Sequence, residues 1–239
     1  MHRWDYATPI PELMRSLNDL ITNGKVLYLG ISDTPAWIVS KANEYARQNG
    51  LRPFVVYQGF WNAGLRDMER DIIPMCRAEG MGITPYGVLG QGRFQTRAGY
   101  EEREKHNPGR KFIPLSERDR AVSKVLETIA NEKKCTLFHV AQAYVMQKTT
   151  YVFPIIGLRK VEHLDGSIEG LKVALGDEDI EKIDQAYEFD HGFPHTFLSG
   201  SMFDGSRPWP ATEAGEVWLN KTYGPFDWVE KEKAIRPKE

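Results

Sequence analysis

Short apolar segments that end at a glycine or a small polar residue alternate with helical patterns along this chain, and this alternation most restricts its fold. The four segments are KVLYLGIS (25–32), PFVVYQG (53–59), MGITPYG (81–87) and YVFPIIG (151–157). Short apolar runs bounded by turns are typical of strands buried on both faces of a parallel sheet. Strand and helix in alternation, joined by short turns, predicts parallel βαβ units.

Helices are predicted around these strands from the 3.6-residue spacing of apolar side chains and from stop signals such as Gly24 and Gly50. The predicted helical ranges are 10–23, 33–50, 66–80, 115–148 as two helices, 159–171, and 176–187 with Asp177 as its cap. Two stretches lack a clear period and are expected to be long loops, 91–116 and the tail from 188 to 239.

Two architectures accept this order, a doubly wound open sheet and part of a (β/α)₈ barrel. The dinucleotide-binding version of the open sheet carries G-x-G-x-x-G directly after its first strand, and LYLGISDTPAW does not contain it. A barrel needs eight strands, and four are visible. The sequence therefore predicts an α/β chain that forms about half of a TIM barrel, as a single domain over 1–239 with βα units in 1–187 and an irregular tail in 188–239.

Composition excludes several classes of function. The net charge of −2 and a pI near 6.3 give no electrostatic reason to bind nucleic acid. Two cysteines without C-x-x-C spacing argue against a disulfide framework and favour a reducing compartment. No run approaches eighteen apolar residues, so a cytoplasmic protein without a membrane anchor is expected. No metal is expected either, because His191 and His195 flank Gly-Phe-Pro, which prevents a helical i, i+4 pair.

Three stretches resemble a known family: HRWDYATPIPELMRSLNDLITNGKVLYLGISDTPAW, YQGFWNAGLRDMERDIIPMCRAEGMGITPYGVLGQGRF and YVFPIIGLRKVEHLDGSIEGL. They are similar to the aldo-keto reductase superfamily, in its fungal aryl-alcohol dehydrogenase and norsolorinic acid reductase-like branch. The resemblance implies the C-terminal half of the barrel, strands five to eight with their helices, in a chain truncated at its N-terminus. It also implies NADP-dependent reduction of an aryl or polyketide-type aldehyde or ketone to an alcohol, within secondary metabolism.

The resemblance assigns a catalytic role to His2, which stands where the family's carbonyl-orienting histidine ends the fourth strand. The family's general acid is a tyrosine whose pKa is tuned by a lysine and an aspartate, because a nearby ammonium stabilises the phenolate. Those three groups belong to the first three strands and have no counterpart here. The alternative interpretation is therefore a catalytically impaired protein that binds cofactor or another protein.

The cofactor residues implied by the resemblance fall into three groups. Near the nicotinamide are Ser32, Asp33 and Gln58, with Tyr86 stacked on the ring. A loop around the pyrophosphate contains Gly87, Val88, Leu89, Gly90, Gly92 and Arg93. The adenosine 2′-phosphate and the adenine are expected at Gly157, Arg159, Lys160, His163 and Ser167. General principles point to the same region, since barrels commonly bind phosphate after strands seven and eight and cations favour a phosphorylated ribose.

The predicted half barrel leaves two sheet edges and one apolar face uncovered, which promotes aggregation unless another chain covers them. A second copy of the chain or a full-length relative is the expected partner, beside a small carbonyl substrate.

Overall fold

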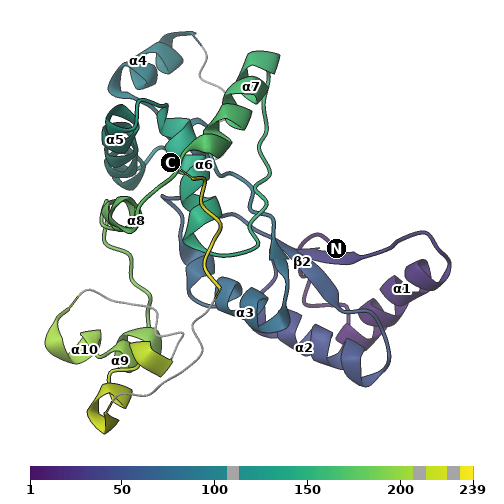
Figure 1. The fold of residues 1–239 in the computed structure, drawn as a ribbon. Coiled ribbons are helices and arrows are strands. Elements are labelled where there is room, and N and C mark those ends of the chain that lie inside the picture. Colours follow the sequence, from purple (N-terminus) through teal and green to yellow (C-terminus); the bar gives the residue numbers. More distant parts are fainter. Residues whose placement is uncertain (107–112, 207–213, 225–231, 239) are drawn as a thin grey trace. The chain divides into compact units, whose positions relative to one another are not determined.

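The computed structural model describes residues 1–106, 113–206, 214–224 and 232–238 (Figure 1). The chain divides into two compact units. Unit 1 contains Met1–Phe60, Asp67–Pro85 and His191–Asp227; unit 2 contains Trp61–Arg66, Tyr86–Asp190 and Trp228–Glu239. That the two units make up one domain stays a prediction.

Unit 1 is built on a parallel three-stranded sheet in the order β1-β2-β3. The strands are β1 (Leu29–Ser32), β2 (Phe54–Gln58) and β3 (Gly82–Ile83), and the register places Ser32 beside Gln58. Three of the four predicted strands and their parallel direction are thereby confirmed.

The helices of unit 1 are α1 (Ile10–Thr22), α2 (Ala36–Gln48), α3 (Ile72–Glu79), α9 (His195–Ser199) and α10 (Ser201–Asp204), with short 3₁₀ turns η1 (Asp67–Glu69), η4 (Ala214–Glu216) and η5 (Asn220–Tyr223). Apolar side chains of the first two helices, Met14, Ile38 and Val39, are buried together with Phe54 and Tyr57 of the sheet. The tail that was predicted to be irregular thus contains the short helices α9 and α10. Each is only about one turn long, so the 3.6-residue spacing of apolar side chains cannot reveal it.

Unit 2 is helical. It contains η2 (Gly90–Gly92), α4 (Arg97–His106), α5 (Glu117–Glu132), α6 (Leu137–Lys148), α7 (Val161–Glu169), η3 (Gly170–Lys172) and α8 (Asp177–Asp184). The two helices predicted within 115–148 are confirmed, and each begins at a capping box, Ser116 with Asp119 and Thr136 with His139. No helix among the described residues is long and apolar enough to cross a membrane.

The loop predicted over 91–116 is wrong in its middle, where α4 forms. Its sequence, RAGYEEREKH, has almost no apolar period but is rich in residues of high helix propensity. Tyr100 fixes this helix to the unit, because its hydroxyl donates to the Arg93 carbonyl at 2.6 Å and the Arg120 guanidinium lies over its ring.

The fourth predicted strand, 151–157, is also wrong. In the described part of the chain this segment has one bridge residue, Val152, and no strand, so the described residues hold three strands rather than the four of the predicted half barrel. Pro154 lacks the amide hydrogen that a central strand needs, and Phe153 is 62% exposed.

A largely buried polar cluster joins α6 to α8. The Tyr144 hydroxyl donates to Asp184 Oδ1 at 2.6 Å, and Lys148 forms an ion pair with the same oxygen. The Arg66 guanidinium donates to the Asp184 carbonyl at 3.1 Å and lies 3.5 Å from the carboxylate. The Asp184 carboxylate therefore contacts two cations that are largely withdrawn from water.

The start of α8 differs from the prediction in its cap. Gly176, not Asp177, is the N-cap residue, and its N–H donates to the Asp179 carboxylate at 2.9 Å. The same carboxylate lies 2.9 Å from Lys133 Nζ. Partial burial disfavours the charged form of Asp179, but the hydrogen bonds from Lys133 and Gly176 outweigh it and lower its pKa below the ordinary 3.8.

This lowered pKa predicts a pH-dependent contribution to stability. A carboxyl group whose pKa is lower in the folded than in the unfolded chain stabilises the fold above the unfolded pKa, and the contribution disappears as the pH falls through the folded pKa. Urea unfolding of the wild type and of Asp179→Asn should therefore differ at pH 7 and converge towards pH 3. A difference of the same size at both pH values would contradict the ion pair with Lys133.

Candidate functional site

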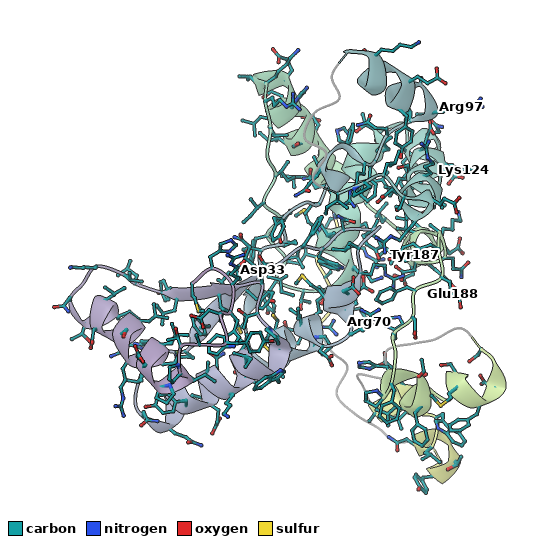
Figure 2. The ribbon with its side chains drawn as sticks, turned by 180° about the vertical axis from the view of Figure 1, so that it is seen from behind. Asp33, Arg70, Arg97, Lys124, Tyr187 and Glu188 are labelled. Carbon is teal, nitrogen blue, oxygen red and sulfur yellow. The ribbon has the colours of Figure 1, made fainter. Side chains whose placement is uncertain are left out.

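The carboxyl ends of β1 and β2 bring four predicted residues of unit 1 together. Residues 1–3 run parallel to β1: the Ser32 N–H donates to the Met1 carbonyl at 3.0 Å, and the Arg3 N–H donates to the Ser32 carbonyl at 3.1 Å. His2 thereby lies beside Ser32, and its Nδ1 is 3.9 Å from Asp33 Oδ2. Figure 2 shows Asp33 at this strand end.

Two polar groups of this strand-end cluster have capacity for a ligand. The Ser32 hydroxyl is buried and has no hydrogen-bond partner among the described residues, whereas buried polar atoms are normally paired. The half-buried Gln58 side chain makes no hydrogen bond to the rest of the described chain, whereas the Gln58 backbone carbonyl accepts from the Asp33 N–H at 3.1 Å. Asp33 itself has a left-handed backbone with φ 44°. A donor-acceptor pair such as a carboxamide fits these groups.

The His2 imidazole is 77% exposed. Over the described residues, no hydrogen bond joins it to a tyrosine or a lysine, so the structure supplies it with no proton-donating partner there. Tyr86 falls in unit 2, where its carbonyl accepts from the Trp61 N–H at 3.4 Å. Its stacking on a ring stays a prediction.

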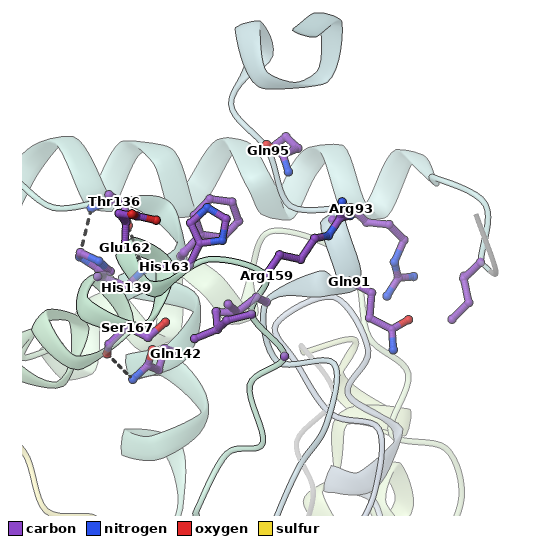
Figure 3. Close-up of a pocket in the computed structure, with 17 residues that line it drawn as sticks. Gln91, Arg93, Gln95, Thr136, His139, Gln142, Arg159, Glu162, His163 and Ser167 are labelled. Carbon is purple, nitrogen blue, oxygen red and sulfur yellow. Dashed lines mark hydrogen bonds between the residues drawn. The ribbon is translucent and has the colours of Figure 1, made fainter. Parts of the chain in front are cut away.

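A pocket of about 940 Å³ lies within unit 2 and is drawn in Figure 3. Its walls come from three segments that are far apart in the sequence, 89–95, the start of α6 over 136–142, and 157–167, together with Ile113. Of the predicted residues, the structure places seven at this pocket: Leu89, Gly92, Arg93, Gly157, Arg159, His163 and Ser167. Gly87, Val88, Gly90 and Lys160 belong to the same unit but do not line it.

The α6 wall was missed by the sequence prediction. Thr136, His139 and Gln142 line the pocket from one side of this helix. Their spacing of three residues places polar groups on one face, and this was the available signal. The Thr136 N–H donates to His139 Nδ1 at 3.5 Å as part of the capping box that begins α6. The Gln142 amide donates to the Ser167 carbonyl at 3.1 Å and ties α6 to α7.

The charges of the pocket differ in how they are held. The Arg93 guanidinium is buried, donates to the Gly90 carbonyl at 3.0 Å and lies 3.7 Å from Asp119, so it fixes the loop. Arg159, in contrast, is exposed and precedes α7, whose N-terminal amides favour an anion. Figure 3 shows its side chain between the Gln91–Arg93 loop and α6. Glu162 also lines the pocket, and its negative charge disfavours an anion there.

Gly90 shapes the loop beside this pocket, and its replacement gives a test. Its φ is +72°, and a Cβ atom would lie 2.7 Å from the Phe94 ring. Gly90→Ala is therefore expected to lower the free energy of unfolding by about 1–3 kcal/mol. Gly157→Ala is the matched control, because a Cβ there would meet no atom of the described residues within 4 Å. Equal melting temperatures for the two variants would contradict the assigned loop geometry.

Comparisons of this sequence with a family model and with known proteins point to the same family. The model of the aldo/keto reductase family matches residues 1–188. Norsolorinic acid reductase B of Dothistroma septosporum is 62% identical over 237 residues, which are 99% of this chain and 60% of that protein. Norsolorinic acid reductase B of Aspergillus parasiticus is 59% identical, over 99% of this chain and 63% of the relative. The aryl-alcohol dehydrogenase [NADP(+)] of Phanerodontia chrysosporium is 44% identical, over 99% of this chain and 60% of that protein.

The chain thus spans about three fifths of the length of these curated relatives. The crystal structure of the thermostable aldo-keto reductase Tm1743 with the inhibitor epalrestat matches with a TM-score of 0.62 and 21% identity. The match covers 78% of this chain and 58% of that one, and it shows the fold, a TIM-barrel type. The predicted resemblance, including the fungal branch, is confirmed. Because the family model covers well over half of its residues, this chain belongs to the aldo/keto reductase family.

Proposed function

We propose that this chain functions as an NADP(H)-dependent oxidoreductase that reduces an aryl or polyketide-type aldehyde or ketone to an alcohol in secondary metabolism. The observation that carries the proposal is the pocket of unit 2, which gathers Arg159, His163 and Ser167 opposite the polar side of α6. The names of the relatives support the class of substrate and, for one of them, the cofactor.

The unit 2 pocket fits the phosphorylated adenosine end of NADP. Arg159 supplies planar donors that match phosphate oxygens, and the first amides of α7 add partial positive charge. His139, Gln91 and Thr136 add polar groups for the ribose or the base. A pocket of this volume is within the usual range for a cofactor site.

The strand-end cluster of unit 1 fits a carboxamide. Ser32 contributes its unpaired buried hydroxyl, and Gln58 contributes an amide with both donor and acceptor. When bound, the nicotinamide supplies a hydride to the carbonyl carbon of the substrate. His2 donates a hydrogen bond to the carbonyl oxygen and orients it, in the role that the family resemblance assigns.

A second function, cofactor binding without turnover, is favoured by the surroundings of His2. Among the described residues, neither a tyrosine nor a lysine is hydrogen-bonded to it, so no group is placed to deliver the proton that the alkoxide needs. General acid catalysis contributes about 10²- to 10⁴-fold to a rate, and its loss would leave binding intact.

Binding and turnover are therefore measured separately on the 239-residue chain. Calorimetric titration with NADPH and NADH should show NADPH bound more tightly by about tenfold or more, since only NADPH carries the 2′-phosphate. Oxidation of NADPH in the presence of an aromatic aldehyde then decides between the two functions. Turnover supports the reductase, binding without turnover supports the second function, and failure to bind either cofactor rejects both.

A further inference from the structure

Helix α7 is held by the side that faces α6 and not by its apolar side chains. None of its nine residues, all of which the structure describes, is buried, and Val161, Leu164 and Ile168 are 69%, 49% and 52% exposed. At about 100° per residue these three positions form one stripe, which faces outwards. An amphipathic helix normally turns such a stripe inwards. The position of α7 therefore depends on the contacts of its opposite side.

A buried amide of α6 makes a polar contact with that side. Gln142 is 3% exposed, and its Nε2 donates to the Ser167 carbonyl at 3.1 Å (Figure 3). Ser167 lies in the last turn of α7, where backbone carbonyls lack the usual partner within their own helix. The Gln142 amide therefore caps α7 from another helix, and it restrains both the rotation and the sliding of α7 on α6.

Close packing beside this hydrogen bond adds to the restraint. A Cβ at Gly170, directly after α7, would lie 3.1 Å from the His139 ring. Gly170 has an ordinary helical φ of −59°, so a glycine is required there for space and not for its backbone conformation. The His139 ring is itself held, because its Nδ1 accepts from the Thr136 N–H at 3.5 Å. Helix α6 therefore leaves α7 little freedom to move.

The other end of α7 carries the groups that attract an anion. Arg159 lines the pocket just before the helix, and the first amides of α7 add partial positive charge. Because an α-helix of nine residues moves as one body, a change at Ser167 also displaces its first turn.

We propose that Gln142 is a positioning residue: by holding the Ser167 carbonyl it fixes the orientation of α7, and it thereby sets the affinity of the unit 2 pocket for a phosphorylated adenosine. The observations that carry this inference are the buried Gln142–Ser167 hydrogen bond and the outward apolar stripe, which leaves α7 dependent on that bond. The inference rests on the proposed function and concerns only its binding step.

The test compares two glutamines of α6 by calorimetric titration with adenosine 2′,5′-bisphosphate, well below the melting temperature of each variant. Gln142→Met keeps the length of the side chain but removes its amide, and it should weaken binding by about 10-fold. Gln147→Met is the matched control. Gln147 is also buried, and its amide donates to the Val173 carbonyl at 2.7 Å and accepts from the Leu175 N–H at 2.9 Å, but it lies outside the pocket lining.

Melting temperature and affinity together separate positioning from a purely structural role. Gln147→Met loses two hydrogen bonds, so it should lower the melting temperature at least as much as Gln142→Met while the affinity stays unchanged. A purely structural glutamine at position 142 would behave like this control, because both variants are folded at the temperature of the titration. Unchanged affinity of Gln142→Met, or equal losses of affinity in the two variants, overturns the proposal.

Gly170→Ala displaces α7 without removing the Gln142 amide. Its Cβ meets the His139 ring, so this variant should weaken binding of the bisphosphate by about 3- to 10-fold. If only Gln142→Met weakens binding, Gln142 contacts the nucleotide directly and the positioning role is rejected. If Gln142→Met does not fold, Gly170→Ala alone decides. A wild type that fails to bind the bisphosphate rejects the proposed function together with this inference, whereas a wild type that binds no better than the two variants rejects the inference alone.

Discussion

Replacing Asp184 with alanine is expected to lower the free energy of unfolding by about 3–5 kcal/mol, because it removes a carboxylate that two largely buried cations contact. Arg66 is 4% exposed and Lys148 is 16% exposed, and both contact this one side chain. Tyr144, which is fully buried, loses the hydrogen bond from its hydroxyl to Asp184 at the same time. The effect should appear as a shift of the urea midpoint at pH 7.

Asp165→Ala provides the matched control, since it removes a carboxylate from an exposed position of α7 and should change stability by less than about 0.5 kcal/mol. Asp184→Asn separates charge from shape: it keeps an oxygen for the Tyr144 hydroxyl but not the charge that Arg66 and Lys148 face. A loss for Asp184→Ala no larger than for the control would show that the cluster is solvated and not a buried network.

Arg159→Glu is expected to weaken binding of adenosine 2′,5′-bisphosphate by about 100-fold, because it replaces a phosphate-pairing guanidinium with a repelling carboxylate next to Glu162. Adenosine 5′-monophosphate, which lacks the 2′-phosphate, should be affected much less. Calorimetric titration of both nucleotides into the wild type and the variant measures the difference.

Lys124→Glu makes the same change of charge on α5, at an exposed side chain that does not line the pocket (Figure 2). Any general effect of net charge on anion binding would appear equally in this control. If both variants lose the same small amount of affinity, or if Arg159→Glu weakens the two nucleotides equally, Arg159 does not contact the 2′-phosphate.

Some elements were predictable because the information is local. The apolar run before Ser32 predicts a strand, and that strand forms because its neighbour Phe54–Gln58 is equally apolar and pairs with it. The family resemblance was carried by contiguous stretches and needed no structure. The strand expected at 151–157 has the same apolar character, but a strand also requires a hydrogen-bonding neighbour and a donor where Pro154 stands.

The polar helix α4 shows the opposite error. Arg97–His106 has no apolar period to detect, and it is held by contacts of Tyr100 with Arg93 and Arg120, which lie elsewhere in the sequence. The α6 wall of the pocket was missed for a related reason. A helix face becomes a binding wall only when other segments are folded opposite it.

The sequence by itself determined the parallel βα order, because apolar period and turn residues are properties of neighbouring positions. The family and the candidate residues for cofactor binding followed from the resemblance of contiguous stretches of the sequence. Only the tertiary structure decided which candidates share a pocket, that Arg93 holds a loop while Arg159 lies exposed in the pocket, and that the apolar stripe of α7 faces outwards. The physical reason is that hydrogen bonds and close packing join residues such as Gln142 and Ser167, which are distant in the chain, and no local pattern encodes those partners.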